Sequence, residues 1–247
     1  MALYYCQLTL HDNIFFASRE MGILYETEKY LHNWALSYAF FKGTYIPHPY
    51  RLQGEKAQTP DYLDSEGEQS LAHLNRLGVY VFPAKPVRWS YQINTFKAAQ
   101  TNYYGKPKQF GDKEANRNYP INYGRAKELA VGSEYYTFLI APKDIKIPHW
   151  IRVGKWLAKV EVKSSVIPEQ AISQKTGLYN CDHPLNPVDL PANQHLLLYN
   201  RIVMPPVSLV SQSQLEGNYW ELSKDILDLP QSISLPIGVS YGASITN

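Results

Sequence analysis

The sequence predicts an α+β fold in which an antiparallel sheet is the larger part. Twenty tyrosines, seventeen prolines and fourteen glycines in 247 residues favour strands, turns and irregular connections over a helical bundle. A hydrophobic fraction of 45% is enough to bury a core. One helix after the first strand and another between later strands are compatible with a ferredoxin-like sheet that carries large insertions. We expect residues 1–247 to form one domain.

The first expected elements are a strand and a helix. The segment Leu3 to Leu10 is rich in residues that favour strands. Thr27 is expected to cap a helix of about four turns, which Gly43 then ends. The helix is predicted from apolar residues at helical spacing, of which we assign Trp34 and Tyr38 to the core: Leu31, Trp34, Ala35 and Tyr38.

Residues 45–70 form a predicted acidic loop, because prolines, glycines and acidic residues are concentrated there. A short helix is expected from Leu71 to Leu77, with Gly78 as its stop, and extended structure follows from Val79 to Phe82. The five acidic residues of the loop are Glu55, Asp61, Asp64, Glu66 and Glu68.

Residues 88–127 carry the strongest local charge. Eight basic and two acidic side chains give this segment +6, whereas the whole chain has +2. Aromatic residues are interleaved with the cations, so a nucleobase can stack on a ring for ~1–3 kcal/mol while a cation contacts the phosphate. Apolar runs on both sides, WSYQINTF and YYTFLI, predict a long hairpin arm. The alternative is a solvated loop whose tyrosines pack back onto the body.

The second half of the chain is predicted to hold two further strands. Alternation from Trp150 to Val162 is typical of one half-buried strand, with Gly154 as a bulge or a point of close backbone approach. Residues 165–194 form a predicted proline-rich connection. The apolar start of the segment His195 to Met204 favours a central strand. Ser223 is expected to cap a short helix near the end.

Other chemical signals in the sequence are weak. His11 and Asp12 are adjacent, but neighbouring side chains on a strand point to opposite faces, so we favour turn or cap roles over a catalytic pair. The run Cys181-Asp182-His183 with His195 lacks the second close pair that zinc sites use, so we expect no metal. Phosphate-binding glycine loops, nucleophile elbows and dinucleotide fingerprints are missing, and we expect no cofactor.

The sequence also bears on localisation. The two cysteines, Cys6 and Cys181, follow no ligand or redox spacing, which indicates a reducing compartment. The N-terminus has no continuous apolar signal core, and the sequence has no run of roughly twenty apolar residues. We therefore expect a soluble, cytoplasmic protein with no membrane partner.

Two runs resemble one known family. The run LTLHDNIFFASREMGILYETEKYLHNWALSYAF, residues 8–40, closely resembles the start of the CRISPR-associated subunit that caps the five-prime end of guide RNA in subtype I-D Cascade complexes. The run IRVGKWLAKVEV, residues 151–162, is similar to the same family. The resemblance implies a member of the repeat-associated RNA-binding superfamily, with an RRM-like (ferredoxin-like) core and a protruding β-hairpin thumb.

The resemblance also implies partners and a binding role without catalysis. The partners are the crRNA, whose five-prime handle the chain would hold, the Cascade backbone and large subunits, and target DNA near the protospacer-adjacent motif. Arg19 and Lys155 are added to the RNA-binding candidates because they lie in the two matching runs. The candidates are Arg19, Arg88, Trp89, Lys97, Tyr103, Tyr104, Lys106, Lys108, Lys113, Arg117, Tyr119, Arg125 and Lys155.

Two other functions stay open at the level of the sequence. A metal-free endoribonuclease that processes precursor crRNA would use a histidine such as His149 with a tyrosine and a lysine. An aromatic surface that binds carbohydrate or protein would explain the tyrosines and tryptophans. Its affinity would hardly depend on salt, because the phosphate contribution would be missing.

Overall fold

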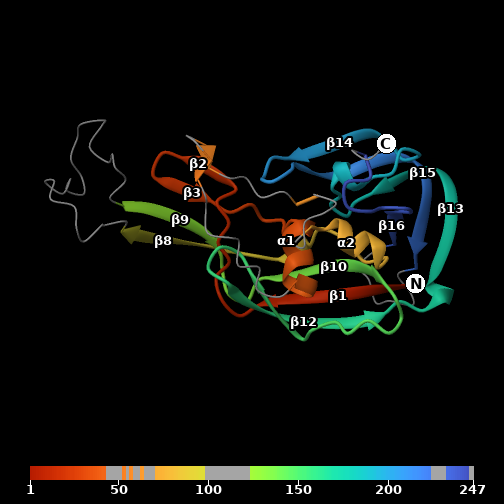
Figure 1. Ribbon diagram of the computed structural model, residues 1–247, viewed down its shortest axis with the longest axis horizontal. Coiled ribbons are helices and arrows are strands. Elements are labelled where there is room, and N and C mark those ends of the chain that lie inside the picture. Colours follow the sequence, from red (N-terminus) through yellow and green to blue (C-terminus); the bar gives the residue numbers. More distant parts are fainter. Residues whose placement is uncertain are drawn as a thin grey trace, which may run out of the picture.

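The computed structural model describes residues 1–42, 52–53, 56–57, 62–63, 70–97, 123–223 and 232–244. These residues form three larger sheets, a small two-stranded sheet and a few short helices (Figure 1). Nearly all the strand pairings are antiparallel, which confirms the predicted α+β class with an antiparallel sheet as its main part.

The main sheet is built around the predicted first strand, β1. Strand β1 (Ala2–Leu10) pairs antiparallel with β10 on one side and with β12 on the other. No helix lies between β10 and β12, a stretch that the structure describes in full, so the RRM-like core is not confirmed and stays a prediction. The order is β11-β12-β1-β10-β6, with β7 also on β10; the partners are β6 (Tyr80–Val81), β7 (Lys85–Arg88), β10 (Glu134–Ala141), β11 (Trp150–Val153) and β12 (Ala158–Val166).

The second sheet has the order β13-β15-β14, and β16 also pairs with β15. Its strands are β13 (Ile172–Cys181), β14 (His195–Ile202), β15 (Leu209–Leu222) and β16 (Ile233–Pro236). The prediction that β14 is central is wrong. It lies at an edge of the sheet and exposes 66% of Leu198, because β15 is its one strand neighbour in the described part of the chain.

The third sheet contains the two flanks of the predicted arm. Its order is β2-β3-β9-β8, and β8 and β9 project away from the rest of the molecule (Figure 1). The pairing of β8 with β9 runs from Tyr91 opposite Leu129 to Lys97 opposite Tyr123, so β8 ends just before residues 98–122 and β9 begins just after them. The strands are β2 (Arg19–Met21), β3 (Leu24–Glu26), β8 (Tyr91–Lys97) and β9 (Tyr123–Leu129).

The sequence analysis assigned the wrong run to the second strand of the hairpin arm. The run from Tyr135 to Ile140 belongs to β10 in the main sheet, and the strand that pairs with β8 in the arm is β9. The alternating segment from Trp150 to Val162 is also two strands rather than one. Gly154 has φ +83° and begins the turn between β11 and β12, which ends the first strand after four residues.

The first helix begins later than predicted. Helix α1 (Asn33–Ser37) is capped by the His32 ring, which accepts the backbone N–H of Trp34, and a π-helical turn, η1 (Tyr38–Lys42), continues it. Thr27 is not its cap. The Thr27 backbone N–H instead donates to Lys127 at 3.0 Å, which holds this residue beside the third sheet.

The remaining elements are short. Helix α2 (Ala72–Arg76) is followed by Gly78 with φ +66°, as predicted. The predicted proline-rich connection contains β13 and two single turns, η2 (Glu169–Ala171) and η3 (Pro187–Asp189), which the sequence analysis did not anticipate. Within the predicted acidic loop, β4 (Leu52–Gln53) pairs with β5 (Lys56–Ala57). The helix predicted after Ser223 lies outside the described residues.

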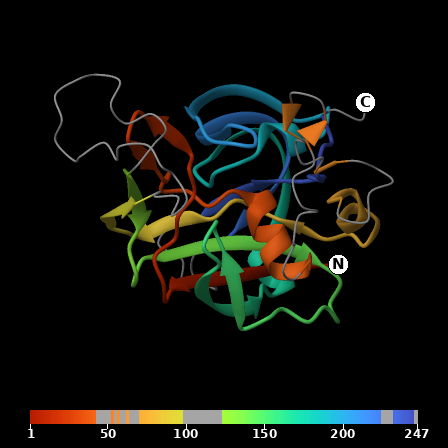
Figure 2. The same ribbon diagram turned by 60° about the vertical axis from the view of Figure 1, so that its left-hand side comes forward.

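One hydrophobic core joins the main sheet, the helices and the second sheet. It includes Leu8 and Phe138 from the main sheet, Leu36 from α1, and Leu215 and Leu235 from the second sheet, all 0–1% exposed. Figure 2 shows α1 across the sheet that contains β1 and β10. Trp34 is buried and Tyr38 is partly buried against the core, in agreement with their predicted assignment.

A buried carboxylate, Asp189, connects several of these elements. Its Oδ2 accepts bonds from Asn33 (2.7 Å), Trp34 (3.2 Å) and Tyr80 (3.2 Å), and its Oδ1 accepts the backbone N–H of Gly242 (2.8 Å). Burial raises the pKa of Asp189 from 3.8 to about 6, although these hydrogen bonds favour the charged form.

We predict that Asp189 makes the protein less stable as the pH rises from about 4 to about 6. Its pKa is higher in the folded state, so the folded state binds more protons over this range and the free energy of unfolding falls by about 2 kcal/mol. Denaturant unfolding of the wild type and of Asp189→Asn across this range measures the difference. A difference that does not depend on pH contradicts the prediction. Asp144→Asn, at an exposed aspartate, is the control and should follow the wild-type curve.

Candidate nucleic-acid interface

The structure describes only part of the predicted binding set. The side chains of Arg19, Arg88, Trp89, Arg125 and Lys155 are described. For Lys97 the backbone is described, at the end of β8. The other candidates lie outside the described residues: Tyr103, Tyr104, Lys106, Lys108, Lys113, Arg117 and Tyr119.

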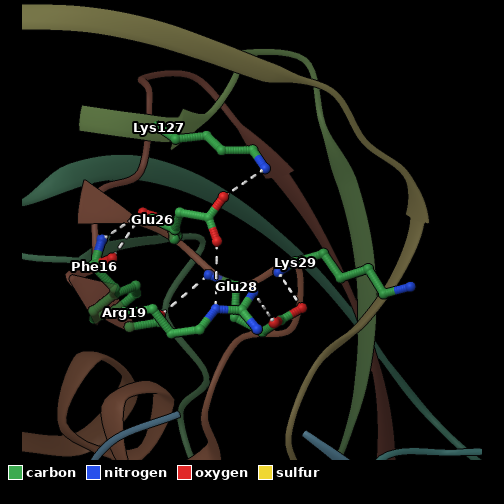
Figure 3. Close-up of polar contacts among 8 residues, drawn as sticks. Phe16, Arg19, Glu26, Glu28, Lys29 and Lys127 are labelled. Atoms are coloured by element: carbon green, nitrogen blue, oxygen red, sulfur yellow. Dashed lines mark hydrogen bonds and ion pairs between the residues drawn. The ribbon is translucent and has the colours of Figure 1, made fainter. Parts of the chain in front are cut away.

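A network of charged side chains crosses the third sheet at the base of the arm (Figure 3). Glu26 shares its carboxylate between two cations, with Oε2 3.4 Å from Nε of Arg19 and Oε1 3.1 Å from Nζ of Lys127. Strand pairing causes this arrangement, because Glu26 lies opposite Arg19 in β2 and opposite Lys127 in β9. Arg19 also donates from Nη2 to Glu28 at 3.0 Å.

Backbone contacts fix the segment that carries these carboxylates. The hydroxyl of Thr27 donates to the carbonyl of Phe16 at 2.8 Å and accepts its N–H at 2.9 Å. The hydroxyl of Ser18 accepts the N–H of Glu28, and the Glu28 carboxylate accepts the N–H of Lys29 (Figure 3). Each carboxylate is therefore held close to its cations before any ligand arrives.

Two aromatic rings beside this network carry a cation. Lys127 Nζ lies 4.4 Å from the ring centroid of Tyr91, and Lys29 Nζ lies 5.1 Å from that of Trp89. Trp89 is 41% exposed and Tyr91 is 37% exposed, so both rings have free surface. A ring and a cation at this spacing suit a nucleotide, since the base can stack while the cation contacts phosphate.

The phenol of Tyr91 stays protonated at neutral pH. Partial burial raises its pKa to about 12, and the carboxylates of Glu28 and Glu26 add to this effect. Tyr91 is therefore a neutral ring with an O–H donor, which suits stacking and hydrogen bonding rather than base catalysis.

The cations of this surface differ in how far they are neutralised. Arg88 forms an exposed ion pair with Glu134 at 2.7 Å. Arg125 is exposed on β9, and neither it nor Lys29 has an ion-pair partner in the described part of the chain. We call Arg19, Lys29, Arg88, Trp89, Tyr91, Arg125 and Lys127, with Glu26, Glu28 and Glu134, the arm-base surface.

Lys155 lies elsewhere, in the turn between β11 and β12. The close backbone approach expected beside it does occur, but the partner is the chain itself. A Cβ on Gly154 would lie 3.0 Å from the carbonyl oxygen of Phe15, and the Lys155 N–H donates to that oxygen at 2.9 Å. The side chain of Lys155 is exposed.

The adjacent groups His11-Asp12 and Cys181-Asp182-His183, considered from the sequence, have separate surroundings in the structure. His11 faces Glu161 at 3.5 Å, whereas Asp12 accepts the N–H of Lys159, so the two have different partners as expected. His183 is fully buried among aromatic rings, which lowers its pKa to about 3. Cys181 bonds to the His183 carbonyl, and no cluster of three possible metal ligands occurs in the described ranges.

Sequence reasoning missed the acidic half of the arm-base surface. Lys127 and Tyr91 lie in the basic, aromatic segment 88–127, but nothing local marks Glu26 as the partner of Lys127 or Glu28 as the partner of Arg19. The signal is the parallel register of β3 with β9, which places residues 26 and 127 opposite each other from distant parts of the chain.

Comparison with known proteins adds a family. The model of the type I-D CRISPR-associated protein Cas5/Csc1 family matches residues 1–244. Among solved structures, a CRISPR protein from Archaeoglobus fulgidus is similar at 10% identity, covering 95% of this chain and 99% of that one. Its TM-score of 0.37 is too low to define a shared fold. No curated protein sequence matches this chain.

No helix in the described ranges is long and apolar enough to cross a membrane. The family match extends over both runs from which the resemblance was inferred, and over β2, β3, β8 and β9 of the arm-base surface. The chain therefore belongs to the type I-D CRISPR-associated Cas5/Csc1 family.

Proposed function

We propose that this chain is a non-catalytic RNA-binding subunit of a type I-D CRISPR effector complex in the cytoplasm. In this role it holds the five-prime handle of the crRNA, contacts the backbone and large subunits, and lies near the protospacer-adjacent motif of target DNA. The observation that carries the proposal is the arm-base surface, where exposed rings and cations lie side by side at the root of a projecting hairpin.

The arm-base surface suits RNA for electrostatic reasons. Within the arm-base surface, Arg125 and Lys29 have no carboxylate partner among the described residues, so they can bind phosphate without first breaking an ion pair. Trp89 and Tyr91 offer ring faces beside them. A polyanion with flat bases uses both features, whereas a carbohydrate uses the rings alone.

The acidic residues tune this binding. Glu26 and Glu28 partly neutralise Arg19 and Lys127, so random polyanions are attracted less strongly than the number of cations suggests. A strand that is correctly placed by Arg125, Lys29 and the rings can then compete with these carboxylates for the partly exposed cations Arg19 and Lys127.

We predict that Lys29→Ala with Arg125→Ala weakens binding of handle RNA and lowers the salt dependence. The slope of log K against log salt should fall by about 1.4, from ~0.7 for each lost contact with a single strand. Fluorescence titration with single-stranded RNA at several salt concentrations measures this slope. Lys143→Ala with Lys175→Ala, at two exposed lysines in ion pairs elsewhere, is the matched control.

An unchanged slope in the double variant would show that these two cations do not contact phosphate. Wild-type binding that hardly responds to salt would favour the aromatic-surface alternative, in which phosphate plays no part.

A second prediction concerns the shared carboxylate. Glu26→Gln should raise the affinity for single-stranded RNA about two- to tenfold at low salt and steepen the salt slope, because Arg19 and Lys127 lose their competitor. The same titration tests it. Glu221→Gln, which releases Lys175 on the second sheet, should leave the affinity unchanged. A fall in affinity would mean that Glu26 mainly positions the two cations.

The non-catalytic part of the proposal has its own test. The purified chain should release no product from labelled precursor crRNA without added metal, because each carboxylate of the arm-base surface, Glu26, Glu28 and Glu134, is paired with a cation. Cleavage that His149→Ala abolishes would overturn this part and favour the endoribonuclease alternative.

A further inference from the structure

A groove of about 390 Å³ lies between helix α1 with its π-helical turn and the hairpin formed by β11 and β12. The helical side contributes Ala35, Tyr38 and Ala39. The hairpin side contributes Trp150, Arg152 and Lys159. The volume falls in the range of ~300–1,000 Å³ that is typical of sites for small ligands.

The groove combines an aromatic ring with positive charge. Trp150 is 44% exposed, and Lys159 Nζ lies 4.0 Å from its ring centroid. Arg152 and Lys155 are exposed at the hairpin. Asp12, at 3.6 Å from Arg152, is the one carboxylate within ion-pair distance of these three cations in the part of the chain that the structure describes.

A short segment of chain connects this groove to the arm-base surface. Ile14 exchanges two backbone hydrogen bonds of 2.9 Å with Leu129, the last residue of β9. The next residue, Phe15, accepts the Lys155 N–H, and its ring stacks on Trp156 at 4.5 Å. Phe16 then lines the groove. Phe16 at the groove is therefore only two residues along the chain from Ile14, which is bonded to the end of β9.

The chemistry of the groove favours a nucleotide over an apolar peptide. A covering peptide without acids would take Arg152, Lys155 and Lys159 out of water without compensating charge, which is costly. A nucleotide provides a flat ring for Trp150 and a phosphate for the cations at the opening. The cations and the exposed ring of Trp150 thus both favour a nucleotide.

We propose that this groove receives one unstacked base of a single-stranded nucleic acid, with the ring against Trp150 and the adjoining phosphate at Arg152 and Lys155. The inference rests on the proposed RNA-binding function, because the arm-base surface delivers the strand, but it assigns a separate site. RNA and DNA strands share this chemistry, so the test must distinguish them.

The test uses the full chain with RNA and DNA oligonucleotides of one sequence, each carrying a single photoreactive 5-iodouracil. Trp150→Leu should lower the affinity about five- to a hundredfold, the range that the loss of one stacked base produces. Arg152→Ala should lower the affinity and reduce the slope of log K against log salt by ~0.7, the value for one lost phosphate contact. Crosslinks mapped by mass spectrometry should include Trp150. Trp150→Leu removes a partly buried ring and could disturb folding, so Arg152→Ala, at an exposed side chain, provides a second test. Circular dichroism checks that both variants fold.

The outcomes of these experiments distinguish the groove inference from the proposed function. If Lys29→Ala with Arg125→Ala weakens binding while both groove variants bind normally and no crosslink reaches Trp150, the groove inference is overturned and the proposed function stands. If neither set of variants changes binding, both are overturned. Loss with RNA alone supports a guide-strand base in the groove, and loss with DNA alone supports a base of the target strands. Competition by an acidic peptide but not by oligonucleotides overturns the inference in favour of a protein partner.

Discussion

An isolated two-stranded hairpin is only marginally stable in water, so the arm formed by β8 and β9 depends on the strand that pairs with it. That strand is β3, and its pairing with β9 is parallel, unlike the other pairings between described strands. The Arg125 N–H donates to Ile23 at 2.7 Å, and the Thr27 N–H donates to Lys127. This pairing therefore stabilises the arm and also sets which charged side chains face each other at its base.

Ion pairs orient the charged residues at the base of the arm, but the cations remain accessible to solvent. Arg19 is 45% exposed and Lys127 is 29% exposed, whereas Glu26 and Glu28 are 15% and 13% exposed, so solvent reaches the cations more than the carboxylates. In the proposed function, a phosphate would approach from the side on which the cations are exposed. The carboxylates of Glu26 and Glu28 orient the cations in the structure, and under the proposed function a bound strand would replace one anion with another. The ion pairs therefore favour specificity over raw affinity.

Patterns in the sequence predicted the α+β class and several local elements, and two runs indicated the family, but the pairing of distant strands was not predictable. The β-rich run became β1, and the leucine spacing before Gly78 became α2 with a glycine stop. The apolar run of β14 was misassigned because it does not distinguish a central strand from an exposed edge. Thr27 failed as a cap because its partners, Phe16 and Lys127, come from other elements. In the site, the sequence indicated Arg19 and Arg125 but not Glu26, whose role depends on register.

The groove also depends on the buried carboxylate of Asp189. Asp189 binds Asn33 and Trp34 in the first turn of α1, which fixes the rotation of the helix about its axis. Residues 35, 38 and 39 follow at helical spacing, so the face bound to Asp189 determines which residues line the groove. Ser37 adds a bond of 2.6 Å to Tyr241, which is itself bonded to β6. The polar cluster in the core thus positions one wall of the groove, while β11 and β12 supply the wall that carries the charge.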